Sequence, residues 1–513
     1  MDALAAVTEE GDKSTRWLLI VAASMSVCML AATLLGPYGY FIDEFYYLAC
    51  ARRPALGYVD HPPLAPWILT GIRAVAGESL LAIRLVPAIA AGATAYASGL
   101  LAREWGGNRF AMCLAAIGTA SMPALGVIGG YYSMNCFELL VWAWVLLLVA
   151  RIANDGSARL WLWVGALIGG GFLLKHTIVL LALGVTAGIV LTPLRRHLRT
   201  RWPWLGVAIA ALLMVPNLGW QIANGWPSLE FYREATAHKN IPTSPLGVLV
   251  NQSMILHPLL VPIWGVGAVS LVTSKRFARH RFMAIVWWGL LALAMAAGTS
   301  RPDRIVGLGA ALFASGAVMW EAWVRRTAGR VALIAAAVAA GLAFAPLSLP
   351  ILSFEATARY AAWTHAVPRI EKGKSSPLPQ WLADRTGWES MIDQVGAVVN
   401  ALPAEERASA LVFAPDYGTA GALELWGPRR GFPRVISTQN SYYHWSEGHT
   451  DSAVLIAIGV SEASLRRAFS DVRRAGTVSC SYCMSWRADR PVFVARQPIV
   501  PLSQFWPEMK HYE

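Results

Sequence analysis

The stretch GYFIDEFYYLACARRPALGYVDHPPL, residues 39–64, decides how the whole chain is interpreted. It follows an apolar run from Trp17 to Gly36, which at about 20 residues is long enough to cross a bilayer. Just past that run it places Asp43, Glu44, Asp60 and His61. A carboxylate that faces lipid is costly, so ionisable residues beside a membrane usually face a cavity and serve a function. The stretch therefore predicts a membrane protein and the location of its functional site.

The composition points to the same class of protein. Of the 513 residues, 56% are hydrophobic and only 14% are charged, with a mean hydropathy of +0.46. A soluble domain carries about 25% charged residues, so the chain is predicted to be an integral membrane protein. Its net charge of +12 comes mainly from short loops between apolar runs. Such loops are topology signals that face anionic lipid, and no nucleic-acid partner is expected.

The apolar runs predict about eleven membrane spans, with a range of 11 to 13. They cover residues 17–36, 80–101, 109–128, 134–151, 160–174, 177–194, 203–220, 251–273, 282–299, 304–324 and 330–350. Alternate loops carry the basic residues Lys13, Arg16, Arg103, Arg109, Arg151, Arg159, Arg195, Arg196, Arg199, Arg201, Lys275, Arg276, Arg279, Arg281, Arg325, Arg326 and Arg330. Because Lys and Arg are retained in the cytoplasm, these loops and the N-terminus are predicted to be cytoplasmic. An odd number of spans then places the C-terminal region outside.

Two domains are expected. Residues 1–351 form the membrane domain, whose outer loop 37–79 carries the polar stretch, and residues 352–513 form a small α/β domain on the outer face. Strands are predicted at Ala410–Pro415, Arg434–Asn440, Ala453–Val460 and Pro491–Gln497, and helices at Thr419–Trp426 and Ser461–Arg474. Cys480 and Cys483 form a C-x-x-C pair with too few ligands for zinc, which leaves a disulfide or two inert thiols.

Asp43 and Glu44 begin a predicted short helix, Asp43–Ala51. Carboxylates also suit the positive end of a helix dipole for structural reasons alone. The functional interpretation is that one of them is a general base that reaches into an outward cavity. Adjacent side chains point in different directions on a helix, so at most one of the two is the base, and Asp43 is the better candidate.

Asp60 and His61 precede a Pro-Pro pair, which restricts the backbone and can hold both side chains in fixed positions. His257 is expected inside the eighth span, near the same outer side. A histidine and a carboxylate can share a divalent cation, although two ligands do not make a metal site and a histidine in an apolar helix is most often a core residue.

Further polar residues are expected on the outer side. Asn135 and Glu138 lie three positions apart, and thus on one helix face, with Glu138 either paired or facing a cavity. Lys175 ends the fifth span, where it either reaches the membrane interface or joins the site. The cations Arg84, Arg301 and Arg304 lie on the same side, and several cations around one cavity suit a phosphate-bearing lipid.

Several strings together resemble the bacterial family 39 glycosyltransferases, relatives of the dolichyl-phosphate-mannose protein mannosyltransferases and of the lipid A aminoarabinose transferases. Besides residues 39–64, these strings are AIRLVPAIAAGA (82–93), YYSMNCFELLVW (131–142), GFLLKHT (171–177), PNLGWQIANGWPSLE (216–230), DYGTAGALELWG (416–427) and STQNSYYHW (437–445). The resemblance covers residues 35–260 best. It implies a polytopic α-helical membrane protein with a GT-C fold in the bacterial inner membrane, whose outer domain is periplasmic or extracellular.

The resemblance also implies roles for individual residues. Asp43 matches the catalytic carboxylate of the first outer loop. Asp60 matches an acidic residue that helps to hold a metal near the donor phosphate, with His257 as a match for a further ligand. The cofactor is therefore either a divalent metal (Mg, Mn, Ca or Zn) or none. His61 stands where relatives often carry Lys, and Tyr58 is expected beside it at the cavity.

The implied reaction moves a monosaccharide from a polyprenyl-phosphate donor to a hydroxyl group of a lipid, polysaccharide or protein, with inversion at the sugar. Residues 298–304, GTSRPDR, depart from the family pattern of a Lys followed by paired tyrosines: Arg301 replaces the charge, and the tyrosines are missing from that segment. A transporter or lipid-sugar flippase is the alternative, because charges within the membrane also mark transport pathways. The sequence shows no related halves of the kind that many transporters have.

Overall fold

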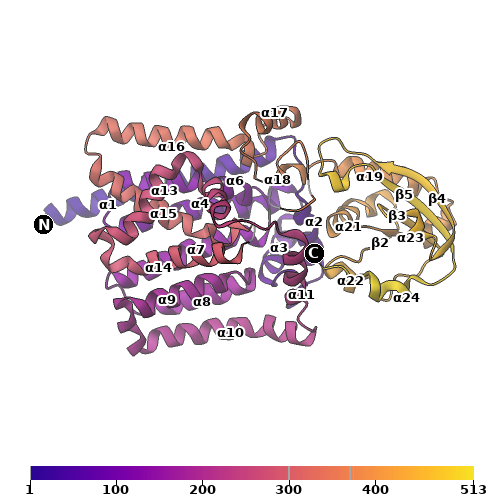
Figure 1. Ribbon diagram of the computed structural model, residues 1–513, viewed down its shortest axis with the longest axis horizontal. Helices are drawn as coiled ribbons and strands as arrows, with labels where there is room; N and C mark the ends of the chain where they lie inside the picture. Colours follow the sequence, from indigo (N-terminus) through magenta and orange to yellow (C-terminus); the bar gives the residue numbers. More distant parts are fainter. Residues whose placement is uncertain (1, 299–300, 369–370, 374, 513) are drawn as a thin grey trace.

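The computed structural model describes residues 2–298, 301–368, 371–373 and 375–512, with side chains from residue 14 onward. A bundle of long helices forms one end of the molecule and an α/β domain forms the other (Figure 1). The N-terminus lies at the far end of the bundle. The C-terminal residues return to the junction of the two parts, where Lys510 forms an ion pair with Glu230.

The helices of the membrane region follow one another with short connections. They are α1 (Asp2–Leu35), α2 (Ile42–Arg52), α3 (Leu64–Ala76), α4 (Leu80–Glu104), α5 (Arg109–Ala120), α6 (Pro123–Gly129), α7 (Met134–Ala153), α8 (Leu160–Leu174), α9 (Ile178–Leu191), α10 (Arg201–Ala223), α11 (Pro227–Glu234), α12 (Pro245–Leu256), α13 (Val261–Thr273), α14 (Arg281–Ala297), α15 (Gly309–Trp323) and α16 (Thr327–Ser348). Short 3-10 helices precede or link some of them: η1 (Pro193–Arg199), η3 (Pro258–Leu260), η4 (Lys275–His280) and η5 (Pro302–Leu308).

Each of the eleven predicted stretches is helical, but not all are straight spans. Within the described residues, seven helices are long and apolar enough to cross a membrane, or up to ten if three bent pairs count as one span each. The pairs α5–α6, α9–η1 and α12–α13 bend by 64°, 98° and 93°. The second part of each pair begins at a proline, Pro123, Pro193 or Pro258, which disfavours helical geometry in the residue before it.

The basic loops meet at the end of the bundle opposite the α/β domain (Figure 1). Asp155, between α7 and α8, forms ion pairs with Arg196 of η1 and Arg279 of η4. Arg276 of η4 donates hydrogen bonds to the carbonyl groups of Trp105 and Gly106, which follow α4. The predicted separation of basic loops from the outer domain is thus present in the fold. Which membrane side each end faces stays a prediction.

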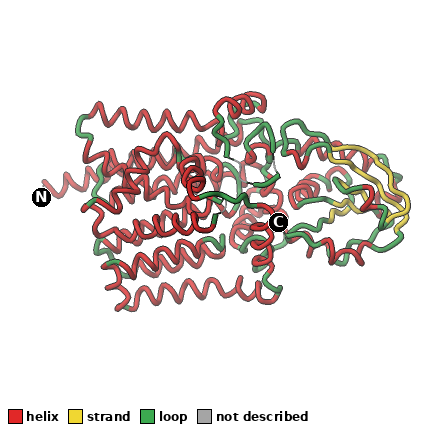
Figure 2. Tube along the Cα trace, in the orientation of Figure 1, coloured by secondary structure: helices red, strands yellow, loops and turns green. Residues whose placement is uncertain are grey.

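The strands are confined to the C-terminal part of the chain (Figure 2). They are β1 (Leu411–Phe413), β2 (Arg434–Ile436), β3 (Val454–Ile458), β4 (Phe469–Val478) and β5 (Arg490–Pro498), in the order β2-β1-β3-β5-β4. The first three run parallel, and β5 pairs antiparallel with β3 and β4. The helices are α17 (Phe354–Thr364), α18 (Gln380–Ala383), α19 (Trp388–Asn400), α20 (Ala404–Ser409), α21 (Tyr417–Trp426), α22 (Ser441–Ser446), α23 (Glu462–Leu465) and α24 (Leu502–Phe505).

One predicted element of this domain is wrong in part. The helix expected over Ser461–Arg474 ends after α23, and the chain continues as the edge strand β4. Eight residue pairs between β4 and β5 supply the backbone hydrogen bonds that outweigh local helix preference. The boundary between the two domains, predicted after residue 351, stays a prediction. Contacts cross it, because Tyr360 of α17 donates a hydrogen bond to the carbonyl of Ala343 in α16.

The α/β domain docks on the membrane region through α21, which packs against α2. Glycines allow this close approach: a Cβ atom on Gly421 would lie 2.7 Å from the Cβ of Phe45 and 2.8 Å from its backbone carbonyl. At the far end of the contact, Arg53 forms an ion pair with Glu424 at 2.7 Å and stacks on Trp445. The contact fixes the first residues of both helices beside each other, and there a cavity opens.

Candidate active site

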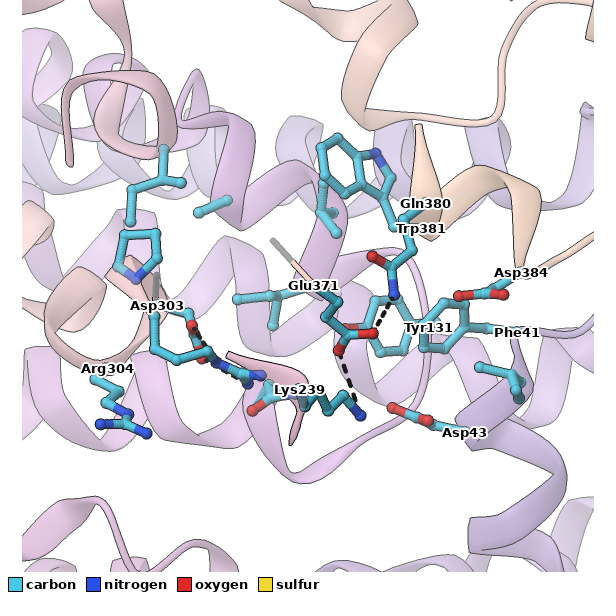
Figure 3. A pocket seen from close by; sticks show the side chains of 18 of the residues that line it. Phe41, Asp43, Tyr131, Lys239, Asp303, Arg304, Glu371, Gln380, Trp381 and Asp384 are labelled. Carbon is cyan, nitrogen blue, oxygen red and sulfur yellow. Dashed lines mark hydrogen bonds and ion pairs between the residues drawn. The ribbon is translucent and has the colours of Figure 1, made fainter. Parts of the chain in front are cut away.

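A cavity of about 360 Å³ lies where the membrane helices meet the outer domain. Its wall includes Asp43 at the start of α2, Asp60, the residues at the start of η5, and Tyr417 at the start of α21. In the view of Figure 3, Arg304 and Asp303 lie toward one end of the cavity and Asp43 and Asp384 toward the other, with Lys239 and Glu371 between them. Segments more than 300 residues apart therefore line one space.

Asp43 lines this cavity and is held by the outer domain. The hydroxyl of Tyr417 donates a hydrogen bond of 2.9 Å to Asp43 Oδ1. Burial raises the pKa of the Asp43 carboxyl above its ordinary value, while the hydrogen bond from Tyr417 and the charge of Lys239 oppose that rise. A carboxyl with a raised pKa and one oxygen fixed in position suits proton abstraction, because the second oxygen remains available to a substrate.

Asp60 lines the same cavity and has its own tyrosine partner. The hydroxyl of Tyr46 donates a hydrogen bond of 2.8 Å to Asp60 Oδ1 and accepts one from the backbone N–H of Ser441. The rings of Tyr46 and Tyr417 lie 4.9 Å apart. Two neighbouring tyrosines thus orient two carboxylates. Burial is the main cause of the raised pKa of Asp43, and the negative charge of Asp60 raises that pKa further.

Four cations line the cavity, and three of them have carboxylate partners. Lys175 forms an ion pair of 2.7 Å with Glu138, Arg301 pairs with Asp303 at 3.2 Å, and Lys239 pairs with Glu371 at 3.3 Å. Arg304 is half-buried, and its guanidinium forms no ion pair with any described residue. Among the described cations of this wall, Arg304 is therefore the best placed to receive the phosphate of a ligand.

Part of the cavity wall is apolar and belongs to the bent helices. Val127 and Ile128 of α6, Met254 and Ile255 of α12, and Phe344 and Leu347 of α16 line it. The bends in the α5–α6 and α12–α13 pairs therefore help to shape the cavity rather than interrupting a uniform bundle. An apolar wall beside a cationic end is suited to a ligand with a lipid tail and a phosphate group.

Glu44 was expected as a second catalytic candidate, but it does not belong to the cavity wall. Its carboxylate forms a fully buried ion pair with Arg84 at 2.7 Å and accepts backbone N–H groups from Phe41 and Tyr132. Arg84 also donates to the carbonyls of Thr33 and Gly39. Arg84, expected as a phosphate-binding cation, is paired within the protein and likewise does not line the cavity. The pair fixes the entry of the chain into α2.

His61 and Tyr58 also lie outside the cavity wall, contrary to expectation. His61 is buried and stacks on the ring of Tyr47 at 4.7 Å, with Nδ1 3.0 Å from the carbonyl oxygen of Pro62. The hydroxyl of Tyr58 donates to the carbonyls of Cys50 and Arg53. Both side chains hold the turn that presents Asp60. Their contribution is to the shape of the loop.

His257 lies within the predicted eighth span, at the point where that span is broken. It stands at the break between α12 and η3, with φ of 141°, and its Nδ1 accepts the N–H of Leu259. It is fully buried against Phe344 and does not line the cavity with Asp60. In the described part of the chain no group of three or more His, Cys, Asp or Glu side chains is arranged to hold a metal ion. The expected metal ligands therefore do not fit, and we derive no step through a metal.

The remaining expected residues are placed as follows. Asp43, Asp60, Asn135, Lys175, Arg301 and Arg304 line the cavity. Glu138 stands behind the wall, where it accepts hydrogen bonds from Lys175 and Thr177. Residues 299 and 300 of the segment GTSRPDR, 298–304, lie outside the described residues.

The sequence analysis missed the tyrosine partners and the Lys239–Glu371 pair. Tyr417 had a usable signal: Gly418 and Gly421 are three positions apart, which is the spacing of small residues on a helix face that approaches another helix closely. Lys239 and Glu371 lie on separate connecting segments with no motif around them. Only the folded chain brings those two together, together with Gln380, which donates to Glu371 at 2.9 Å.

The chain is similar to known proteins in sequence and in fold. Residues 60–220 match the family model of the dolichyl-phosphate-mannose-protein mannosyltransferases. The lipid A galacturonosyltransferase RgtD of Rhizobium johnstonii is 25% identical over 184 residues, an alignment that spans 36% of this chain and 38% of that protein.

Solved structures resemble the chain over most of its length. ArnT from Cupriavidus metallidurans bound to undecaprenyl phosphate has a TM-score of 0.61 and 17% identity, covering 94% of this chain and 98% of that one. The oligosaccharyltransferase of Archaeoglobus fulgidus has a TM-score of 0.52 and 13% identity, covering 82% of this chain and 63% of that one. The chain is thus similar in fold to these solved structures over almost its whole length, and residues 60–220 match the mannosyltransferase family model in sequence.

Proposed function

We propose that the protein transfers a monosaccharide from a polyprenyl-phosphate donor to a hydroxyl group of a lipid acceptor, with inversion at the anomeric carbon. The observation that carries this proposal is the content of one cavity: Asp43 lines it as a candidate base, and it also holds Arg304 and the apolar side chains of α6, α12 and α16. RgtD is named for lipid A and one ArnT structure contains undecaprenyl phosphate, which supports a lipid-linked donor and a lipid acceptor here.

The proposed reaction is a single displacement. The lipid tail of the donor lies along the apolar wall, and its phosphate is bound by Arg304 with help from Arg301 and Lys175. Asp43 takes the proton from the acceptor hydroxyl as the hydroxyl oxygen attacks the anomeric carbon. The bond from that carbon to the phosphate oxygen breaks, and polyprenyl phosphate leaves. Cations at the leaving group stabilise the charge that develops there.

Each residue has a defined part in this proposal. General-base catalysis is typically worth about 10²–10⁴-fold in rate, so it is the task of Asp43. Neutralising the leaving phosphate and excluding water supply further stabilisation of the transition state. We further propose that the site opens on the periplasmic or outer side of a bacterial plasma membrane, with the basic loops in the cytoplasm.

Two variants test the proposal on purified protein in lipid nanodiscs with a radiolabelled polyprenyl-phosphate sugar. Asp43→Asn keeps donor binding and loses about 10²–10⁴-fold in kcat, because the base is removed. Arg304→Ala raises the donor KM about tenfold, since a hydrogen bond to a charged group contributes about 1.5–3 kcal/mol. Arg466→Ala, a substitution on the exposed face of the outer domain, is the matched control and keeps both constants.

The outcomes separate the candidate functions. Sugar transfer by Asp43→Asn at the wild-type rate contradicts the role of Asp43. Movement of the lipid-linked sugar across proteoliposomes without formation of a glycosidic bond favours the transporter alternative. Mass spectrometry of the lipids from cells with and without the gene identifies the sugar and the acceptor.

A further inference from the structure

The C-x-x-C pair lies in a built site that the proposed glycosyl transfer does not use. Cys480 and Cys483 stand between β4 and the turn η7 (Ser485–Arg487) in the outer domain. The backbone N–H of Cys483 donates to Cys480 Sγ at 3.2 Å, and Cys483 Sγ donates to the carbonyl of Cys480 at 3.4 Å. Cys480 is half-buried and Cys483 is buried, with 3% of its surface exposed. One thiol is thus accessible and the other is protected behind it.

The surroundings of the pair favour a thiolate at Cys480. Its sulfur packs over Gly387, the N-cap residue of α19, where a Cβ atom would lie 2.4 Å from Sγ. The N-terminal end of a helix stabilises a negative charge. The hydrogen bond from Cys483, with a contribution from the Arg487 charge, lowers the pKa of the Cys480 thiol to about 6, whereas the hydrogen bond with Cys480 raises the pKa of Cys483.

Arg487 is an independent sign of a reactive site. Its guanidinium is buried, stacks on the ring of Trp388 at 3.8 Å and donates through Nη2 to the carbonyl of Thr386. Its Nε and Nη1 atoms have no hydrogen-bond partner among the described residues. A buried cation with unused donors is costly unless an anion accompanies it, and a thiolate of the adjacent pair supplies that anion.

The same loop forms part of the cavity wall. Trp486 lines the cavity, as do Gln380, Trp381 and Asp384 of the neighbouring segment. Met484 packs with Leu382 and Ala383, so the two segments share a small apolar core. A covalent change at Cys480 and Cys483 acts directly on the backbone that carries this wall.

We propose that Cys480 and Cys483 form a redox-active dithiol site whose reaction partner is a disulfide-bearing oxidant. The Cys480 thiolate attacks one sulfur of the oxidant, forming a mixed disulfide and releasing one thiolate. The Cys483 sulfur, after loss of its proton, then attacks Cys480, forming the Cys480–Cys483 disulfide and releasing the second thiolate. Two protein thiols are oxidised and one disulfide is reduced to two thiols, so electrons and atoms balance.

Oxidised glutathione is the probe, applied to the reduced full-length protein in detergent and followed by peptide mass spectrometry. The wild-type protein loses two hydrogens within the peptide that contains both cysteines. Cys483→Ser retains one glutathionyl group on Cys480, because the resolving thiol is missing, and Cys480→Ser gains none on the buried Cys483. The same protein unfolded in denaturant is the comparison for these thiols without their surroundings.

A second measurement makes the test independent of sugar transfer. The rate of Cys480 alkylation is measured across pH in Cys483→Ser and in the double variant Cys483→Ser, Arg487→Gln. Loss of the Arg487 charge moves the midpoint of the rate–pH curve to higher pH. Hydrogen exchange of the segment from 380 to 387 slows in the oxidised wild type. Two thiols that stay free with oxidised glutathione, or an alkylation midpoint of Cys480 equal to that in the unfolded protein, overturn the proposal. Neither result bears on the role of Asp43.

Discussion

At the scale of single residues, Asp43 and Glu44 show how neighbours in sequence acquire different functions. Asp43, the second residue of α2, faces the cavity and the hydroxyl of Tyr417, and Glu44 enters a fully buried ion pair with Arg84. Successive helical side chains point about 100° apart, so only one of the two can face a given cavity. The choice between them depends on which partners the rest of the chain brings.

Removal of the Tyr417 hydroxyl tests how Asp43 is held. In Tyr417→Phe, Asp43 loses a hydrogen bond that opposes the effect of burial, so its pKa rises further. A general base must be ionised, and activity is lost as the pH falls through its pKa. The acid limb of the kcat/KM profile is therefore expected to move to higher pH, and kcat to fall about tenfold. Tyr443→Phe, whose ring stacks on Trp506, is the control and keeps the wild-type profile.

Loss of one partner of the buried ion pair tests the structural role of Glu44. Arg84→Ala leaves an unpaired carboxylate with no exposed surface, and such a loss typically costs about 3–5 kcal/mol of unfolding free energy. The exposed pair of Arg466 with Glu462 contributes at most about 1 kcal/mol, so Arg466→Ala is the comparison. Thermal unfolding in detergent measures both. An Arg84→Ala protein as stable as wild type contradicts the structural interpretation.

At the scale of elements, the contact of α21 with α2 positions the candidate base. Both helices begin at the cavity, and glycines on α21 let their backbones approach closely enough for Tyr417 to reach Asp43. The bends at Pro123 and Pro258 act in the same way for the membrane helices, because they bring α6 and α12 to the cavity wall. The site is built from helix ends and breaks rather than from straight spans.

A methyl group at this contact is expected to weaken docking. In Gly421→Ala the new Cβ meets the backbone of Phe45 at 2.8 Å, and backbone atoms cannot rotate away. Such overpacking costs about 1–3 kcal/mol, and activity falls because Tyr417 is displaced from Asp43. Gly219→Ala on α10 is the matched control, since a Cβ there meets no atom within 4 Å. The measurements are the unfolding temperature and the pH profile of kcat/KM. If both are unchanged in Gly421→Ala, the close contact is not needed for docking or for positioning Asp43.

At the scale of the whole molecule, charge separates the two ends. Basic loops gather at one end of the bundle and the α/β domain covers the other, so these loops and the cavity lie at opposite ends of the helices (Figure 1). If Lys and Arg stay in the cytoplasm, the cavity and the dithiol site both face an extracytoplasmic, oxidising compartment.

Protease treatment of membrane vesicles checks this orientation. In right-side-out vesicles the α/β domain is expected to be cleaved while the loops that contain η1 and η4 remain intact. Inside-out vesicles give the reverse pattern. Cleavage of η1 and η4 in right-side-out vesicles contradicts the orientation, whatever the catalytic residues prove to be.

The sequence by itself determined the membrane class, the helical stretches and the position of the polar loop. These are local signals, because bilayer thickness sets the length of a hydrophobic run and Lys and Arg in the loops are retained in the cytoplasm. It also singled out Asp43 and Asp60, because a carboxylate that faces lipid is energetically costly and is therefore expected to face a cavity. Only the tertiary structure decided that Glu44 and Arg84 neutralise each other, that His257 stands at a helix break, and that residues 469–474 pair as a strand. Tyr417 reaches Asp43 across more than 300 residues of chain, and such a contact has no local signal because it arises from packing between distant segments.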